Sequence, residues 1–180
     1  PLREEAADAV RELKEAGITK VVMMTGDSER TAAAIAKRVG VDEYYSEVLP
    51  EDKASFVEKE KELEHKVVMI GDGINDSLAL SSASVGIAIS DGAAIAREIA
   101  DVTISADNLH EIVTLKRLST ALMKRIHNNY RTIIGINGGL IALGVTGIIM
   151  PTTSALLHNM STLTISLRSM RNLLPKEEEA

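Results

Sequence analysis

The sequence predicts an α/β fold with a parallel sheet, followed by a helical hairpin that spans a membrane. Helix-like and strand-like apolar patterns alternate along residues 1–107, as they do in βαβ units. The strand-like stretches 21–24 and 67–70 are apolar at every position, which suits a sheet covered on both faces. Residues 132–167 contain no Asp, Glu, Lys or Arg, a length sufficient for two short membrane crossings.

The composition narrows the classes of protein to consider. A net charge of −6 over 180 residues gives no general attraction to nucleic acid, so a nucleic-acid partner is not expected. The chain has no cysteine, which excludes disulfides and thiolate metal sites within it. Aromatic residues make up only 2% of the chain, so the core must consist of aliphatic side chains and methionine.

The first 107 residues are expected to form one domain of alternating helices and strands. Gly17 and Gly40 follow helical patterns at the position that ends a helix, and Pro50 suits the first turn of another. The expected helices cover residues 2–16, 28–39, 50–63, 77–83 and 91–100. The expected strands lie at 18–24, 41–48 (a short strand within loops), 66–70, 85–89 and 101–104.

The remaining residues predict a stalk and two membrane helices. Residues 108–131 read as an amphipathic stalk helix, 132–150 and 153–173 as the two crossings within 132–174, and 175–180 as an acidic tail. Five glycines of the first crossing should give it small faces for close helix packing: Gly135, Gly138, Gly139, Gly144 and Gly147. Basic residues flank the hairpin on both sides and are absent from its turn, so both ends should be cytoplasmic. A buried helical hairpin in a soluble protein is the alternative.

The polar loop after the strand at 67–70 is the centre of the expected chemistry. Asp72 and Asp76 offer hard carboxylate oxygens for Mg²⁺, with the amide of Asn75 beside them. Thr25-Gly26-Asp27 ends another strand and opens a helix, an arrangement that suits a phosphate. Lys53 can offer a positive charge to a phosphoryl oxygen.

Each of these motifs alone also has an ordinary structural explanation, as a capped turn or a solvated lysine. Together they supply the cation ligands, the positive charge and the backbone amides that phosphoryl transfer requires.

Three segments resemble the phosphorylation domain of P-type cation ATPases, which has a haloacid-dehalogenase-like fold: MTGDSERTAAAIA, LPEDKA and GDGINDSLALSSASVGIAI. The helical end, with LLHNMSTLTISLRSMRNLL, resembles the heavy-metal-transporting (CPx-type) branch of that family. The resemblance implies an ATP-driven pump with an aspartyl-phosphate intermediate. It implies contacts to the phosphoryl group for Thr25, Gly26, Asp27 and Lys53, a Mg²⁺-binding role for Asp72, and roles for Asn75 and Asp76 in the phosphoryl site and the Mg²⁺ shell.

The family's DKTGT motif, which carries the phosphorylated aspartate, is absent from this sequence. The chain is therefore expected to be the C-terminal piece of a pump, with a partial parallel sheet that lacks its first strand. ATP would bind mainly to the missing domains. The expected partners are the missing N-terminal part of the pump, the lipid bilayer and a transition-metal ion. The expected location is the membrane of a prokaryotic cell, with several crossings in the complete protein.

Polar side chains within the predicted crossings are the candidates for the transported metal: Asn137, His158, Asn159, Met160 and Ser161. An imidazole suits Zn²⁺, Co²⁺, Ni²⁺ or Cu²⁺, whereas the thioether of Met160 would suit Cu⁺. Hydrogen bonding between helices is the alternative role for His158 and Asn159.

Two other functions remain open. One is a truncated or split-gene accessory chain without activity of its own. The other is a membrane-anchored phosphatase of the haloacid dehalogenase superfamily, which would need an Asp-x-Asp nucleophile pair that is not found here.

Overall fold

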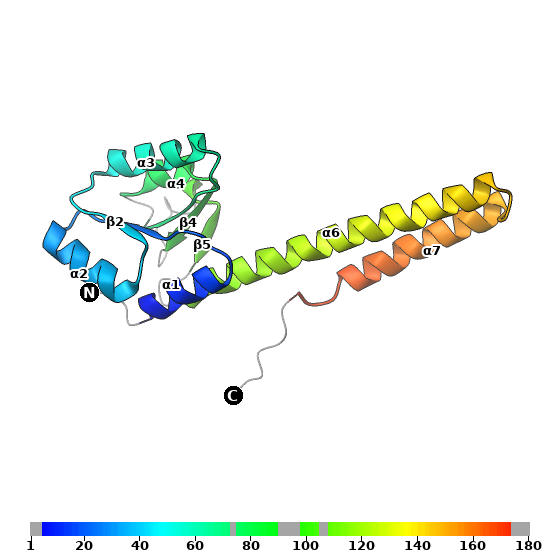
Figure 1. The fold of residues 1–180 in the computed structure, drawn as a ribbon, viewed down its shortest axis with the longest axis horizontal. Coiled ribbons are helices and arrows are strands. Elements are labelled where there is room, and N and C mark those ends of the chain that lie inside the picture. The colour runs from blue at the N-terminus through cyan, green and yellow to red at the C-terminus, as the bar shows by residue number, and fades with distance from the viewer. Residues whose placement is uncertain (1–4, 73–74, 90–97, 105–107, 174–180) are drawn as a thin grey trace, which may run out of the picture. The chain divides into compact units, whose positions relative to one another are not determined.

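The computed structural model describes residues 5–72, 75–89, 98–104 and 108–173 (Figure 1). The chain divides into two compact units, Pro1–Thr114 and Leu115–Ala180.

The first unit is built from helices that alternate with parallel strands, as the sequence predicts. Its described elements are α1 (Ala6–Glu15), β1 (Val22–Met24), α2 (Glu29–Val39), β2 (Glu43–Tyr45), α3 (Pro50–Glu62), β3 (Val68–Gly71), α4 (Ser77–Ser82), β4 (Val85–Ile89) and β5 (Val102–Ile104). β1 pairs with β2 in parallel, with Val22 opposite Glu43. β3, β4 and β5 pair in that order, also in parallel, with Val68 opposite Val85.

The strands form two sheets, whereas the alternation predicted one. β1–β2 is a two-stranded sheet and β3–β4–β5 a three-stranded sheet. A single sheet would need a strand that is hydrogen-bonded to both β1 and β3. None of the described strands is, so the strands form two separate sheets.

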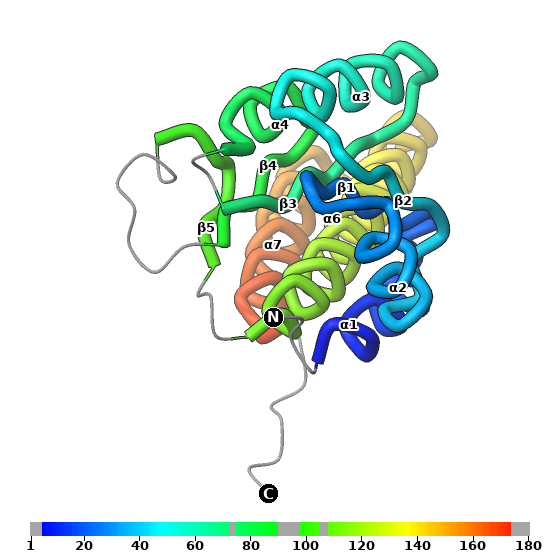
Figure 2. The backbone as a smooth tube through the Cα atoms, turned by 90° about the vertical axis from the view of Figure 1, so that its left-hand side faces the viewer, coloured from blue at the N-terminus to red at the C-terminus, as the bar shows by residue number. Residues whose placement is uncertain are grey.

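The core of the first unit is small and aliphatic. α3 packs against α4, α4 packs against β3 and β4, and α2 packs against β2 and α1 (Figure 2). Val57, Leu80 and Val113 are the largest side chains that are fully buried. Alanines such as Ala32, Ala79 and Ala88 are also completely enclosed, which lets the helices lie close to the strands.

Glycine and proline end and begin the helices where the sequence predicts. Gly17 (φ 98°) and Gly40 (φ 79°) adopt the left-handed conformation directly after α1 and α2. Pro50 occupies the first turn of α3. β1 and β2 are shorter than predicted, because only residues 22–24 and 43–45 of the predicted stretches 18–24 and 41–48 pair as strands, whereas β4 has the predicted bounds 85–89. The helix predicted at 91–100 lies largely outside the described residues.

The second unit is an antiparallel pair of helices. α6 (His110–Val145) begins in the first unit, where Ile112 and Val113 are buried, and continues without a break through the predicted stalk and most of the first predicted crossing. α7 (Pro151–Ser169) starts two residues before the predicted boundary because Pro151 occupies its first turn. The two helices lie side by side in both views (Figures 1 and 2).

The contact between α6 and α7 is rich in polar and small side chains. Half-buried positions recur at helical spacings, mostly of three, four or seven residues, along both helices: Ala121, Arg125, Asn129, Ile136, Asn137 and Leu140 on α6, and Ser154, Ser161, Ile165 and Ser169 on α7. The Arg125 guanidinium donates to the backbone oxygens of Ser169 and Asn172, both at 2.9 Å, and to that of Arg171. The Asn129 amide donates to the Ser169 hydroxyl at 2.7 Å.

The glycines of the first predicted crossing do not pack against α7, so their predicted role in close helix packing stays a prediction. A Cβ atom placed at Gly135, Gly138 or Gly139 would meet nothing within 4 Å, so α7 does not pack against these positions. Instead, Ile136, Asn137 and Leu140 provide the half-buried side of this part of α6.

No helix in the part of the chain that the structure describes combines the length and the mean hydropathy of a membrane span. The transmembrane hairpin therefore stays a prediction.

Candidate functional site

Two of the predicted phosphate-site motifs directly follow the carboxyl ends of strands. Thr25–Asp27 follows β1 and precedes α2, and Asp72 follows β3. Ligands of open α/β sheets bind at this edge, so the strand ends place both motifs where phosphate chemistry is expected.

The Thr25–Asp27 loop is held by its own side chains and by the segment after β2. The Thr25 hydroxyl donates to the Asp27 carboxylate at 3.0 Å and accepts the Asp27 N–H at 3.1 Å. The Thr25 N–H donates to the backbone oxygen of Tyr45, and the Val48 N–H donates to the backbone oxygen of Thr25, both at 3.0 Å. The backbone of this loop is therefore fixed on both sides of Thr25 before any ligand binds.

Lys53 and Asp76 form an ion pair across α3 and the start of α4. Lys53 Nζ lies 2.7 Å from Asp76 Oδ1, although the residues are 23 positions apart in the sequence. Their side chains are only 16% and 11% exposed. The structure thus brings together two of the residues that the sequence singles out, with little water around the pair.

Asp72 is joined to Asn75 on the following turn. The Asn75 backbone N–H donates to Asp72 Oδ1 at 3.2 Å, and its amide donates to Oδ2 at 3.4 Å. The residues between them, 73 and 74, lie outside the described part of the chain.

Gly71, immediately before Asp72, leaves room for the Asp76 side chain. A Cβ atom at position 71 would lie 2.6 Å from Asp76 Cβ, closer than such atoms approach in proteins. The glycine is therefore required for Asp76 to reach Lys53.

The described residues contain no group of three or more His, Asp or Glu side chains that could hold a metal ion. Asp72, Asp76 and Asn75 instead present two carboxylates and one amide. A cation bound there would take its remaining ligands from water or phosphate, as Mg²⁺ commonly does.

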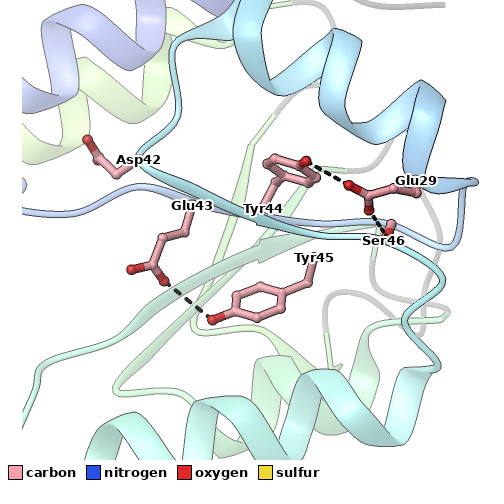
Figure 3. A pocket seen from close by; sticks show the side chains of 6 residues that line it. All are labelled: Glu29, Asp42, Glu43, Tyr44, Tyr45 and Ser46. Atoms are coloured by element: carbon pink, nitrogen blue, oxygen red, sulfur yellow. Dashed lines mark hydrogen bonds between the residues drawn. The ribbon is translucent and has the colours of Figure 1, made fainter.

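A cluster beside the Thr25–Asp27 loop was not predicted from the sequence. An open pocket of about 540 Å³ is lined by Glu29, Asp42, Glu43, Tyr44, Tyr45 and Ser46 (Figure 3). Within it, the Glu29 carboxylate accepts hydrogen bonds from the Tyr44 hydroxyl at 2.7 Å and the Ser46 hydroxyl at 2.6 Å. The two-residue spacing of Tyr44 and Ser46 is the sequence signal that could have placed them on one side of the strand.

Hydrogen bonding shifts the acidity of several groups near this pocket. The Ser46 and Tyr44 hydroxyls lower the pKa of Glu29, and the Glu29 carboxylate raises the pKa of Tyr44. The Lys14 ammonium and the Val21 N–H lower the pKa of Asp42. The carboxylates of Glu29 and Asp42 are therefore ionised at neutral pH.

In the second unit, the structure joins two of the five candidates for the transported metal. His158 Nδ1 lies 2.8 Å from the Asn137 side-chain oxygen. The Ser161 hydroxyl donates to the His158 backbone oxygen at 2.8 Å. Asn159 and Met160 are exposed on α7 and share no described contact with the Asn137–His158 pair.

Comparisons with known proteins agree on one group of enzymes. The family model described as a haloacid dehalogenase-like hydrolase matches residues 1–84. A zinc-exporting P-type ATPase from Mycobacterium marinum is 36% identical over 171 residues, which are 94% of this chain and 23% of that protein. A manganese-exporting P-type ATPase from Mycobacterium bovis is 37% identical over 94% of this chain and 24% of its own length.

A solved structure extends the similarity to three dimensions. A zinc-transporting PIB-type ATPase in the E2.Pi state matches 97% of this chain with a TM-score of 0.87 and 34% identity. The match covers 28% of that chain. The present chain therefore spans about a quarter of the length of these three proteins.

Proposed function

Because the chain combines a haloacid dehalogenase-like domain with homology to heavy-metal-exporting P-type ATPases over 94% of its length, we propose that it is part of an ATP-driven transition-metal pump. The relatives are enzymes, and in this proposal the pump forms an aspartyl-phosphate intermediate. The observation that carries the proposal is the Lys53–Asp76 pair, which lies 2.7 Å apart in a mostly buried position.

In the phosphoryl site, this chain supplies the positive charge and the backbone donors. Lys53 neutralises charge on the phosphoryl oxygens, and the Thr25–Asp27 loop holds the group by its hydroxyl and N–H groups. Asn75 orients Asp72 through their two hydrogen bonds. The phosphorylated aspartate comes from the part of the pump that this sequence does not contain.

Mg²⁺ fits the donors that Asp72 and Asp76 present. Both are carboxylates, the ligand type that this ion prefers, and one or two carboxylates with phosphate and water complete its usual shell. When bound, Mg²⁺ would neutralise negative charge on the phosphoryl group. Lys53 holds the Asp76 side chain in place through the 2.7 Å ion pair.

The division of the first unit into two sheets supports a partner that contributes a strand. β1 is paired with β2 and β3 with β4, and in the described structure neither has a second neighbour. Val68 of β3 is 44% exposed, unusual for an apolar residue of a covered sheet. A strand from the N-terminal part of the pump would pair with these edges and end beside Thr25 and Asp72.

The second unit is proposed to cross the membrane, with both of its ends cytoplasmic. Large apolar side chains lie outward along both helices, among them Ile141 (67% exposed), Leu156 (60%) and Leu163 (61%). Lipid or neighbouring helices of the complete pump would cover them. The location proposed for the whole protein is therefore a cell membrane, with the bilayer as a second partner.

The transported metal is the substrate of this part of the proposal. Asn137 and His158 are its candidate ligands because the structure brings their side chains together and an imidazole suits divalent transition metals. Asn159, Met160 and Ser161 remain candidates that would need a different helix arrangement or neighbour. In the complete pump, His158→Ala should lower metal-stimulated ATP hydrolysis while phosphorylation by inorganic phosphate persists; unchanged metal dependence would assign His158 to helix packing.

The phosphoenzyme tests the catalytic part of the proposal. In the complete pump, Asp72→Ala should abolish Mg²⁺-dependent phosphoenzyme formation from ATP. Asp8→Ala is the matched control, because that carboxylate is 56% exposed on α1 and pairs only with Arg11 among the described contacts. Normal phosphoenzyme levels in Asp72→Ala would contradict the role of Asp72.

A further inference from the structure

Strand β2 carries two neighbouring tyrosines that hold the helices on its two sides. Tyr44 and Tyr45 point to opposite sides of the strand, as consecutive strand residues do (Figure 3). The Tyr45 ring packs against Phe56 of α3, with ring centroids 5.3 Å apart. The Tyr44 hydroxyl donates to Glu29 in the first turn of α2. β2 therefore contacts both the helix that follows the Thr25–Asp27 loop and the helix that carries Lys53.

Glu29 is the centre of the contact with α2. Its two carboxylate oxygens are used separately, one by Tyr44 at 2.7 Å and the other by Ser46 at 2.6 Å. Hydrogen bonds to an ionised carboxylate are shorter and stronger than those between neutral groups. The hydroxyls lower the pKa of Glu29, so the carboxylate keeps its charge at neutral pH.

The bonds of Glu29 fasten the segment after β2 to the phosphate loop. Ser46 is followed by Glu47, whose N–H donates to the backbone oxygen of Asp27 at 3.0 Å. Glu47 has a φ of 54°, a left-handed conformation that residues other than glycine rarely adopt. The surrounding contacts must therefore maintain this turn, and the Ser46–Glu29 bond is the side-chain contact next to it.

We propose that Glu29, bound by Tyr44 and Ser46, is a positioning residue that fixes the Thr25–Asp27 loop for the phosphoryl group. Glu29 acts through Tyr44 and Ser46 on the backbone of residues 45–48, which is hydrogen-bonded to Thr25 and Asp27. The inference rests on the proposed function, because it assigns the loop to phosphate binding.

The experiment measures phosphorylation of the complete pump by inorganic phosphate, together with the Michaelis constant for ATP. Glu29→Ala should raise the phosphate concentration for half-maximal phosphorylation about tenfold, close to the lower end of the effect of losing one hydrogen bond to a charged group. Glu29→Gln keeps one acceptor oxygen and should raise it about twofold. The Michaelis constant for ATP should stay unchanged, because the nucleotide is expected to bind mainly outside this chain.

The hydroxyl partners provide an independent test of the same cluster. Tyr44→Phe combined with Ser46→Ala should raise the half-maximal phosphate concentration about as much as Glu29→Ala. The triple variant should show no larger effect than either, because all three changes remove the same two bonds. These substitutions are conservative or exposed, so the fold should survive them, and the thermal unfolding midpoint of each variant checks this.

Glu43→Gln is the matched control. Like the Glu29 variants, it removes one negative charge, but from β2 instead of α2. The Glu43 side chain contacts Lys20 and Tyr45 and makes no described contact with the Thr25–Asp27 loop. Its phosphate dependence should equal that of the parent pump.

A parent pump that forms phosphoenzyme while Glu29→Ala keeps the parent phosphate dependence would overturn only the positioning role. Additive effects in the triple variant, or an equal rise in the constant for ATP, would overturn it too. A parent pump that forms no phosphoenzyme at all would overturn the proposed function and this inference with it.

Discussion

Replacing Lys53 with methionine should destabilise the first unit by about 3 kcal/mol. The change keeps most of the aliphatic side chain but removes the ammonium group that lies 2.7 Å from Asp76 Oδ1. Asp76 would then be a carboxylate without its ion-pair partner, and its residue is only 8% exposed.

The magnitude follows from the distance and the burial of the pair. At an effective dielectric constant of about 20, unit charges 2.7 Å apart attract by about 6 kcal/mol. Desolvation of the two groups offsets roughly half of that attraction. Breaking a buried pair from one side commonly costs about 3 to 5 kcal/mol, and the residual exposure of 16% and 11% favours the lower end of this range.

Urea unfolding, followed by the near-ultraviolet circular dichroism of tyrosine, measures the effect. The chain has no tryptophan and three tyrosines, of which Tyr44 and Tyr45 lie in the first unit. A double-mutant cycle with Asp76→Asn should give a coupling energy above about 1.5 kcal/mol.

The matched control is Lys61→Met, which removes an exposed lysine of α3 that donates only to the Ser82 backbone oxygen among the described contacts. It should cost less than about 1 kcal/mol. A coupling energy below about 0.5 kcal/mol between Lys53 and Asp76 would refute the reasoning.

Three further changes test other contacts. Gly71→Ala should cost about 1 to 3 kcal/mol, measured by the same unfolding assay, because the new Cβ would press on Asp76. Lys14 and the Val21 N–H lower the pKa of Asp42, so this contribution to stability is present above the ordinary pKa and is lost as pH falls through the lowered value. Thermal unfolding between about pH 5 and pH 2 should therefore show a weaker acid dependence in Asp42→Asn, and an unchanged profile would argue against the pair. Arg125→Ala should speed amide hydrogen exchange in the last turn of α7 about tenfold, since the guanidinium donates to the backbone oxygen of Ser169, the last residue of α7, and to that of Asn172 just beyond it, whereas Lys124→Ala should not.

The helices and strands of the first unit were largely predictable because local signals specify them. Gly17, Gly40 and Pro50 act through their own backbone preferences, and the structure confirms each. Their effect does not depend on distant parts of the chain. The division into two sheets was not predictable from alternation, because pairing between strands depends on which strands are present.

The candidate site was predicted as a set of residues but not as a set of contacts. The sequence singled out Lys53 and Asp76 separately, and only the packing of α3 against α4 reveals that they form an ion pair. Glu29 escaped notice because an acidic residue in the first turn of a helix is ordinary. Its importance depends on Tyr44 and Ser46, whose hydroxyls donate to its carboxylate in the structure in which β2 pairs with β1.

In the second unit too, the sequence predicted residues but not the contacts that they make. Glycines along a helix indicate that something can approach closely, but the pattern does not say which helix does so. In the structure the contact with α7 uses Arg125, Asn129 and Asn137 instead, whose polar side chains bond across the pair. The glycines Gly135 and Gly138 lie open to other neighbours.

ATP-dependent metal uptake into inside-out vesicles that contain the complete pump tests the central claim most directly. A panel of divalent and monovalent transition-metal ions should reveal at least one that accumulates only with ATP and Mg²⁺. Asp72→Ala should abolish that uptake, whereas the surface control Asp8→Ala should retain it. Vesicles that accumulate none of these ions, or an Asp72→Ala pump that transports as the parent does, would contradict the account.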